Sequence, residues 1–189
     1  MNDKKKDLRK KLSKKRSELK NSIKITDETF SRIILKHDLL RNCNIIASFL
    51  SIKTEISTFH LNNFIQKLEK FLCLPVIDEL NNGILIFKEY LNDDNLKVGK
   101  FGVKEPINSN TLLPDIIFTP CLAYDLEGFR LGYGGGYYDK TISYLNSIGH
   151  NFLTVGLAFD DQKVDSVIHN NLDQKLNYIL TEKQLYKTL

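Results

Sequence analysis

Hydrophobic and polar residues follow two different periods along the chain, and the change of period divides it into helices and strands. Apolar residues at helical spacing predict helices over residues 5–20, 25–41, 60–72 and 139–149. In the first of these segments Leu8, Leu12 and Leu19 share one side, and lysines surround the rest. A short terminal helix is also predicted over residues 182–189.

Short apolar runs rich in β-branched and aromatic residues predict buried strands between these helices. The runs cover residues 44–50, 73–77, 84–90, 115–125, 152–159 and 178–181. The turn residues Asn81, Asn82 and Gly83 precede the third run, so it can pair with the second as a hairpin. Because nearly continuous apolar runs alternate with helices, we predict a three-layer α/β fold with a mostly parallel sheet between helices.

The size and composition are those of one globular domain, which we place at residues 1–189. The chain has 189 residues, of which 42% are hydrophobic and 26% charged. No apolar run approaches the roughly 20 residues that cross a bilayer, so we expect no membrane partner. The basic N-terminus lacks the apolar stretch of a secretory signal, and Asp3, Asp7 and Glu18 argue against a mitochondrial transit peptide. We therefore expect a cytoplasmic protein.

Positive charge is concentrated at the N-terminus. Residues 1–20 contain ten Lys or Arg and three acids, a net charge of +7, whereas the remaining residues carry −3. This asymmetry indicates an anionic partner. A nucleic-acid-binding arm would interleave aromatic residues with the basic ones, and residues 1–20 contain none. We therefore expect no nucleic-acid partner.

The cysteines point to buried thiols. Cys43, Cys73 and Cys121 lie far apart without a Cys-x-x-Cys pair, which argues against a disulfide framework and against a zinc cluster. Cys121 lies near the glycine-rich stretch described next, but no nearby histidine is available to activate it as a nucleophile.

The stretch RLGYGGGYYDK, residues 130–140, combines four glycines with three tyrosines where a predicted strand leads toward a predicted helix. Ligands of parallel sheets bind beyond the carboxyl ends of the strands. Glycines let backbone N–H groups turn toward an anion, and the N-terminus of the next helix favours negative charge at the same place. The stretch is neither a Walker A loop nor, with Tyr137 at the third glycine position, the dinucleotide fingerprint. From spacing alone, a phosphate cradle and a plain tight turn both remain open.

Charged residues at the ends of this stretch fit phosphate and metal chemistry. Asp139 at the predicted helix start is either a cap or, beside a phosphate cradle, an oxygen ligand for Mg²⁺. Asp173 is the candidate for a second acidic ligand. Arg130 is either a surface arginine or a bidentate phosphate ligand.

The longer segment TPCLAYDLEGFRLGYGGGYYDK, residues 119–140, resembles the signature of the 5-formyltetrahydrofolate cyclo-ligases, also called methenyltetrahydrofolate synthetases. That family carries a Pro, a small-aromatic-Asp triplet, a Gly turn and then Arg-Leu-Gly-x-Gly-x-Gly-Tyr-Tyr-Asp. Three further segments agree in order and spacing, so that the resemblance spans almost the whole chain. They are KKDLRKKL (5–12), SFLSIKTEIST (48–58) and LDQKLNYILTEK (172–183).

The match has departures at two positions. Leu172 stands where many bacterial members have His, and Asn177 stands where the family usually has Asp. Asp173 is retained, so the metal site need not be lost, but any role of a carboxylate at position 177 is in doubt.

The resemblance implies the conversion of 5-formyltetrahydrofolate and ATP to 5,10-methenyltetrahydrofolate, ADP and phosphate. In that chemistry the formyl oxygen is phosphorylated to an iminium phosphate, N10 of the folate attacks, and phosphate departs; positioning and charge neutralisation then supply most of the catalysis. ATP, Mg²⁺ and 5-formyltetrahydrofolate are the implied ligands, and a monomer or weak homo-oligomer is expected. The alternative is a sugar-phosphate isomerase or a CoA-transferase-like α/β enzyme, which would need an acid/base or carboxylate nucleophile.

The resemblance also implies roles for individual residues. The expected nucleotide-binding residues include the basic pair of the first helix, one turn apart, and the glycine-rich stretch: Lys5, Arg9, Arg130, Leu131, Gly132, Tyr133, Gly134, Gly135, Gly136, Tyr137 and Tyr138. The expected substrate-binding residues wall the pterin or bond to its edge: Leu50, Glu55, Tyr133, Gly134, Gly135, Gly136 and Tyr137. Arg130 and Tyr137 are the expected catalytic residues, and Asp139 and Asp173 the expected metal ligands.

Overall fold

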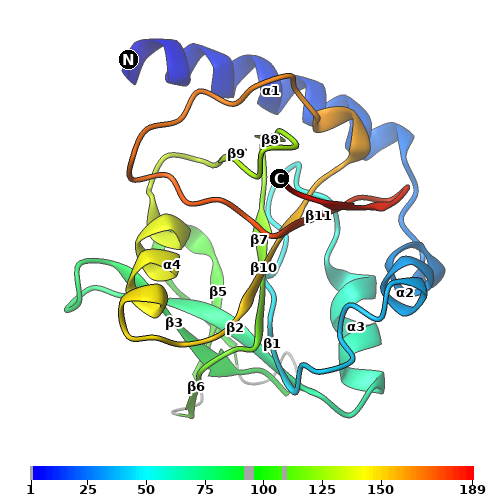
Figure 1. Cartoon of the computed structure of the whole chain (residues 1–189), viewed down its shortest axis with the longest axis vertical. Helices are drawn as coiled ribbons and strands as arrows, with labels where there is room; N and C mark the ends of the chain where they lie inside the picture. Colours follow the sequence, from blue (N-terminus) through cyan, green and yellow to red (C-terminus); the bar gives the residue numbers. More distant parts are fainter. Residues whose placement is uncertain (1, 92–95, 108–109) are drawn as a thin grey trace.

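The computed structural model describes residues 2–91, 96–107 and 110–189, and an eight-stranded sheet forms its centre (Figure 1). The strand order is β12-β11-β10-β7-β1-β2-β3-β6. The strands are β1 (Ile45–Ala47), β2 (Phe71–Asp78), β3 (Ile84–Glu89), β6 (Thr111–Leu112), β7 (Ile116–Pro120), β10 (Leu153–Leu157), β11 (Tyr178–Leu180) and β12 (Leu185–Lys187). The five strands from β2 to β11 in this order run parallel, whereas β12 pairs antiparallel with β11, β3 with β2, and β6 with β3. The predicted mostly parallel sheet and the β2–β3 hairpin are therefore confirmed.

Helices cover both faces of the sheet. Helices α2 (Asp27–Lys36) and α3 (Phe59–Lys67) lie on one face, and α4 (Tyr137–Ser147) lies on the other (Figure 1). The long helix α1 (Asn2–Ser22) crosses one end of the layers, above the hairpin of β8 (Ala123–Tyr124) and β9 (Arg130–Leu131). The predicted three-layer α/β fold is confirmed. None of the helices in the described ranges is both long and apolar enough to cross a bilayer.

Successive residues of the central strands point to opposite faces, and both faces are buried. Ile46 and Ile116 belong to the core cluster that α2 and α3 cover, whereas their neighbours Ala47 and Ile117 pack with Leu145 of α4. Because neither face meets water, these strands have apolar residues at consecutive positions. This two-sided burial explains the continuous apolar runs in the sequence.

The predicted terminal helix is wrong, because residues 182–189 contain strand β12. After a turn at Thr181–Gln184, β12 pairs antiparallel with β11. Leu185 packs into the core on the α2–α3 face, while the next residue, Tyr186, packs on the α4 side. Neighbouring side chains on opposite faces are the geometry of a strand, and pairing with β11 outweighs the helical propensity of this segment.

Several boundaries also differ from the predictions. The second helix ends at Lys36 and turns follow it, the third ends at Lys67, and the predicted strand 115–125 divides into β7 and β8. The sequence did not predict β4 (Leu96–Val98), β5 (Lys104–Pro106), β6, β9, or the short 3₁₀ helices at Lys100–Gly102 and Asp160–Gln162. These elements have two or three residues, too few to show a hydrophobic period.

We expect Gly156→Ala to destabilise the fold, because Gly156 of β10 lies in a tightly packed layer. An added Cβ would lie 2.7 Å from Cδ1 of Ile179 and 2.8 Å from Cδ1 of Leu176. Overpacking of this kind costs about 1–3 kcal/mol, measurable as a lower free energy of unfolding in urea. Gly132→Ala is the control, since its Cβ meets no described atom within 4 Å. Equal stability of the two variants would contradict the packing argument.

Candidate functional site

The chain leaves the central strands β1 and β7 in opposite directions, which creates a topological switch point between them. From β1 the sheet continues through β2 and β3, and from β7 it continues through β10 and β11. Ligands of open α/β sheets bind at such a point, beyond the carboxyl ends of the strands. The segment 48–58 follows β1 and the segment 121–136 follows β7. The structure therefore brings the two segments with the predicted site residues to the same end of the sheet.

A buried aspartate holds the hairpin that leads into the glycine-rich stretch. Asp125 is 1% exposed, and its carboxylate accepts hydrogen bonds from the backbone N–H groups of Phe129 (2.9 Å) and Val167 (2.8 Å). These bonds fix the β8–β9 turn and fasten it to the segment after β10. The Asp of the small-aromatic-Asp triplet is thus a structural anchor for the loop.

Two glycines of the stretch occupy places that no other residue could take without movement. Gly134 has φ +107°, and an added Cβ would lie 3.1 Å from Cζ of Arg9. An added Cβ on Gly135 would lie 2.4 Å from the ring of Tyr137. Backbone thus passes directly against a guanidinium on one side and a tyrosine ring on the other, and Gly136 then leads into α4.

Arg9 comes from α1 and reaches the glycine-rich stretch. Its Nε donates a hydrogen bond of 2.9 Å to the carbonyl of Gly132. Lys5 lies one turn earlier on α1, and its side chain lies outside the described part of the chain. The structure therefore brings Arg9 to the glycine-rich stretch, and the nucleotide-binding roles of both Arg9 and Lys5 stay predictions.

Helix α1 is docked over the carboxyl ends of the strands by apolar and polar contacts. Leu8 and Leu12 pack against the cluster of Ala123, Phe129 and Leu131. Farther along the helix, Lys15 donates a hydrogen bond to the carbonyl of Asp161.

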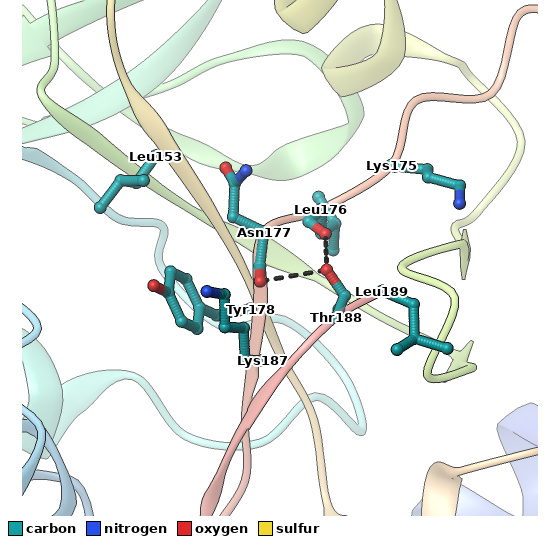
Figure 2. A pocket seen from close by; sticks show the side chains of 8 residues that line it. All are labelled: Leu153, Lys175, Leu176, Asn177, Tyr178, Lys187, Thr188 and Leu189. Carbon is teal, nitrogen blue, oxygen red and sulfur yellow. Dashed lines mark hydrogen bonds between the residues drawn. The ribbon is translucent and has the colours of Figure 1, made fainter.

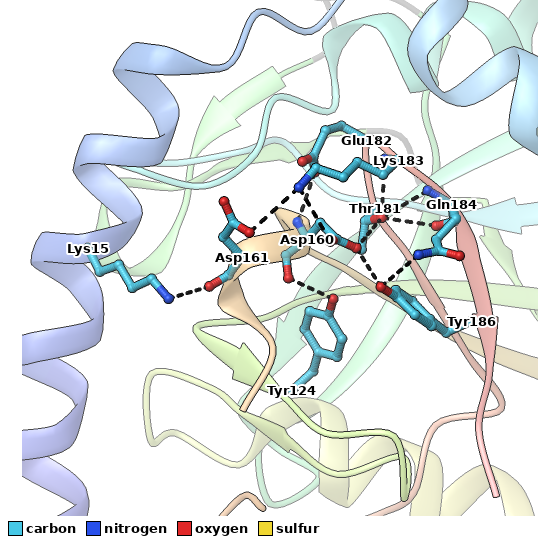
Figure 3. Close-up of polar contacts among 9 residues, drawn as sticks. All are labelled: Lys15, Tyr124, Asp160, Asp161, Thr181, Glu182, Lys183, Gln184 and Tyr186. Atoms are coloured by element: carbon cyan, nitrogen blue, oxygen red, sulfur yellow. Dashed lines mark hydrogen bonds and ion pairs between the residues drawn. The ribbon is translucent and has the colours of Figure 1, made fainter. Parts of the chain in front are cut away.

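Figure 3 shows that the Asp161 region belongs to a polar network around Asp160, which joins the ends of β10 and β11. Asp160 accepts hydrogen bonds from Tyr186 (2.7 Å) and Thr181 (3.2 Å), and its N–H donates to Glu182. Burial raises the pKa of Glu182. The network therefore holds in place the segment to which Lys15 of α1 bonds.

Arg130 and Asp139 meet beneath the glycine-rich stretch. Nη1 of Arg130 lies 3.1 Å from Oδ1 of Asp139, and the Arg130 side chain is only 4% exposed. The contact is not aligned as a hydrogen bond, so Nη1 has no hydrogen-bond acceptor among the residues that the structure describes. A buried N–H group without an acceptor is costly, and an anionic ligand at this place would supply one.

The two predicted metal ligands, Asp139 and Asp173, come from segments that lie side by side in space. Asp139 accepts a hydrogen bond of 3.1 Å from the backbone N–H of Gln174, the residue after Asp173. Across residues 2–91, 96–107 and 110–189, no three His, Cys, Asp or Glu side chains gather as a metal site. Two carboxylates suit Mg²⁺, which takes one or two protein ligands and completes its shell with water and phosphate oxygens.

The loop after β1 places Glu55 in a buried position. Glu55 is 3% exposed, and its Oε2 accepts a hydrogen bond of 2.8 Å from the N–H of Ile52. Burial raises the pKa of Glu55, and the Ile52 N–H, Arg16, Tyr133 and Lys20 oppose that rise. Leu50 is half-buried in the same loop. The structure thus brings Tyr133 of the glycine-rich stretch to Glu55.

The other aromatic residues of the stretch are held by the fold. Tyr137 and Tyr138 pack against the apolar cluster between β2, β3 and α4. Burial raises the pKa of Tyr138, and Cζ of Arg130 lies 5.8 Å from the centre of its ring. Leu131 is buried in β9. Burial also raises the pKa of Cys121 to about 12, so its thiol stays protonated at neutral pH, in agreement with the interpretation as a buried thiol.

The structure adds a site residue that the sequence did not predict. Arg16 is 1% exposed and lies beside Glu55 and Tyr133. It stands among lysines in the sequence, which hides it in a basic run. One signal could have revealed it, because Arg16 is four residues after Leu12 and three before Leu19, on the apolar side of the helix.

The residue at the second departure from the family pattern lies away from this site. Asn177 precedes β11, and its Oδ1 accepts hydrogen bonds from the N–H (2.8 Å) and hydroxyl (2.9 Å) of Thr154 near the start of β10. Figure 2 shows it in a hollow whose other lining residues are Leu153, Lys175, Leu176, Tyr178, Lys187, Thr188 and Leu189. These residues lie at the amino ends of β10 and β11 and the carboxyl end of the antiparallel β12, opposite the switch point. Asn177 therefore links the starts of β10 and β11 by hydrogen bonds.

We expect Asp139→Asn to destabilise the ligand-free protein, because it leaves the buried guanidinium of Arg130 without its carboxylate. A loss of about 1–3 kcal/mol is typical when a buried polar group loses its partner, measurable by urea unfolding without nucleotide or metal. Glu79→Gln is the matched control. It removes the carboxylate of the exposed Glu79–Lys100 pair, and exposed pairs contribute at most about 1 kcal/mol. Equal losses would mean that Arg130 does not need Asp139.

Comparison with known proteins shows the family of this chain. Residues 1–182 match the model of the 5-formyltetrahydrofolate cyclo-ligase family. The chain is 38% identical over 145 residues to the 5-formyltetrahydrofolate cyclo-ligase of Haemophilus influenzae, covering 74% of this chain and 76% of that protein. It is 29% identical over 164 residues to the Escherichia coli K12 protein of the same name, covering 84% and 85%.

Solved structures have the same fold. The NMR structure of Aquifex aeolicus 5,10-methenyltetrahydrofolate synthetase superposes with a TM-score of 0.70 at 28% identity, covering 97% of this chain and 92% of that one. The structure of 5,10-methenyltetrahydrofolate synthetase from Mycoplasma pneumoniae gives a TM-score of 0.68 at 21% identity, covering 94% and 98%, and supports the fold. From the match over 182 residues and the close relatives, this chain belongs to the 5-formyltetrahydrofolate cyclo-ligase family.

Proposed function

We propose that the chain converts 5-formyltetrahydrofolate to 5,10-methenyltetrahydrofolate, the reaction of its family, and uses ATP and Mg²⁺ to do so. One observation carries the assignment of this reaction to the switch point. Arg9, the glycine-rich stretch and the Glu55 loop come from three distant parts of the sequence and meet there. They offer a cationic side for phosphates and an acidic side for a pterin.

The nucleotide side is supported by the donors that converge on the glycine-rich stretch. Arg9 lies against Gly132 and Gly134, and the N-terminus of α4 follows Gly136. Helix N-termini and charged guanidinium groups both bind phosphates. The buried N–H of Arg130 that lacks an acceptor fits the same ligand. Lys5 would extend this set along α1.

Asp139 and Asp173 would hold Mg²⁺ beside those phosphates. Asp139 makes an ion-pair contact with Arg130, so a positive charge compensates its carboxylate. A bound metal would take over this role and leave the guanidinium of Arg130 to a phosphate oxygen. Mg²⁺ would supply charge neutralisation on the phosphates that are transferred.

The folate side is supported by Glu55, Leu50 and Tyr133. An ionised carboxylate can accept two parallel N–H bonds, which matches the amidine-like edge of a pterin. Leu50 supplies an apolar wall, and the 45% exposed ring of Tyr133 offers a face for stacking. Tyr137, under Gly135, would keep the stretch in place at the reacting formyl group.

Phosphorylation by ATP would turn the formyl oxygen, a poor leaving group, into a phosphate that N10 of the folate can displace. The residues of the site need only hold the two ligands in line and neutralise charge, which is how phosphoryl transfer is generally catalysed. No nucleophilic side chain is required, in keeping with the protonated, buried Cys121. The family match thus favours this reaction over the isomerase and CoA-transferase alternatives.

The direct test is to mix the protein with Mg-ATP and 5-formyltetrahydrofolate and to follow the methenyl product by its absorbance, together with ADP. We expect both products only when protein, folate, ATP and Mg²⁺ are all present, and chelation of the metal should stop the reaction. ADP release that does not depend on folate, or no methenyl product from a folded protein, would refute the proposal.

We expect Arg9→Ala to weaken the binding of a non-hydrolysable ATP analogue, with little change in the binding of 5-formyltetrahydrofolate. A hydrogen bond to a charged group contributes about 1.5–3 kcal/mol, or roughly tenfold to a hundredfold in affinity. Calorimetric titration of each ligand separates the two effects. Lys14→Ala is the control, because Lys14 is exposed on the same helix. Equal small losses would show that α1 acts only as a diffuse positive charge.

A further inference from the structure

Arg16 differs from the other basic residues of α1 because it is buried. Lys10, Lys11, Lys14 and Lys15 are exposed, whereas Arg16 is 1% exposed and is among the largest fully buried side chains. It faces inward between Leu12 and Leu19, which pack on the core. Burying a charge costs solvation energy, and an apolar residue of similar size would often pack as well or better. Its burial therefore needs an explanation other than packing.

The guanidinium of Arg16 binds three segments of the site at once. Its Nε donates to the hydroxyl of Thr54 at 3.0 Å, in the loop after β1. Its Nη1 donates to the carbonyl of Cys121 at 3.1 Å, just after β7. Its Nη2 donates to the hydroxyl of Tyr133 in the glycine-rich stretch. One planar group thus joins the ends of both strands of the switch point and the stretch above them.

Arg16 is also the main positive charge next to Glu55. The charges and titratable groups that face Glu55 come from α1, the glycine-rich stretch, α4 and the end of β7, and they are Arg16, Lys20, Tyr133, Tyr138 and Cys121. Arg16 and Lys20 lower the pKa of Glu55, and Arg16 has the larger effect. Tyr133 interacts with both partners, since its hydroxyl accepts from Arg16 and its hydrogen bond with Glu55 also lowers the pKa of that carboxyl.

We propose that Arg16 is a positioning residue that fixes Tyr133 and Glu55 in the arrangement in which they bind the pterin end of the substrate. The inference rests on the proposed function, and it adds a residue that touches neither ligand. Arg9 and Arg16 are seven residues, or about two turns, apart on one helix. Arg9 serves the phosphate side, and Arg16 serves the folate side.

The test compares Arg16→Met with Arg16→Lys. Arg16→Met should weaken 5-formyltetrahydrofolate binding at least tenfold in calorimetry without ATP, and should raise its KM by a similar factor. Affinity for the ATP analogue should change less than threefold. Arg16→Lys should rescue little, because an ammonium group cannot reproduce the three-way planar fork. Lys14→Met, which alters an exposed residue of the same helix, should leave folate affinity within twofold of the wild type.

The pH dependence of folate binding separates positioning from a merely structural role. Glu55 must be ionised to accept two N–H bonds. Without Arg16 the pKa of Glu55 rises further, so the carboxyl is protonated over a wider range on the acidic side. Arg16→Met, which removes the positive charge, should therefore lose folate affinity at a higher pH than the wild type as pH falls, and should recover part of it as pH rises. A structural role would lower affinity by the same factor at every pH.

Tyr133→Phe provides a second route if Arg16→Met does not fold. It removes only the hydroxyl that accepts the hydrogen bond from Nη2 of Arg16. It should weaken folate binding about three- to tenfold, by the loss of roughly one hydrogen bond. In the Arg16→Lys background the same change should have a smaller effect, since contacts that belong to one network are not additive. Full additivity, or unchanged folate affinity in Tyr133→Phe and Arg16→Lys, overturns the inference.

Failure of the Arg16 inference can be distinguished from failure of the proposed function. If the wild type forms no methenyl product, the proposed function fails whatever Arg16 does, and this inference fails with it. If the wild type forms the product and Arg16→Met retains the wild-type KM and pH profile, the proposed function stands and only the role of Arg16 is wrong.

Discussion

The parallel pairing of β1 with β7 determines where the site of this protein can form. The pair is held in register by Asp115, whose carboxylate accepts hydrogen bonds from the N–H groups of Asn44 (2.7 Å) and Ile45 (2.9 Å), just before and at the start of β1. From this pair the chain departs to opposite sides of the sheet, and the loops that follow the two strands have no strand between them. A shift of one residue would turn Ile46 and Ile117 to the wrong faces and would move both loops. The core and the site therefore share a single constraint.

The sequence predicts those parts of the structure that depend on local patterns. The apolar runs at 44–50 and 115–125 predict two buried strands, and the glycines of 130–140 predict a tight turn, because both features follow from neighbouring residues. Strand β12 escapes prediction because its conformation is set by pairing with β11. Arg16 escapes because its partners Thr54, Cys121 and Tyr133 lie 38, 105 and 117 positions away. The ligand-binding roles of all the predicted site residues, Lys5, Asp139 and Asp173 among them, stay predictions, since they depend on ligands.

Two buried arginines of the site each lie beside a carboxylate. Arg16 lies beside Glu55 and Arg130 beside Asp139, and in both pairs the arginine is buried in the part of the site that the family reaction would use. Opposite charges that are buried side by side contribute little net stability, because desolvation offsets their attraction. They hold charge in fixed positions instead, so that the protein need not reorganise when a charged ligand arrives. The site thus trades stability for preorganisation.

Helix α1 leaves the ribosome well before the segments on which it docks. Leu12 packs against Phe129, and Arg9 bonds to Gly132. Lys15 bonds to Asp161, which is synthesised 146 positions later. Domains are synthesised at only about 5–20 residues per second, so the basic helix spends several seconds without its docking surface. Loop-closure entropy also delays contacts between such distant residues. We therefore expect α1 to dock over the carboxyl ends of the strands only after those strands have been synthesised, so that the site is completed late.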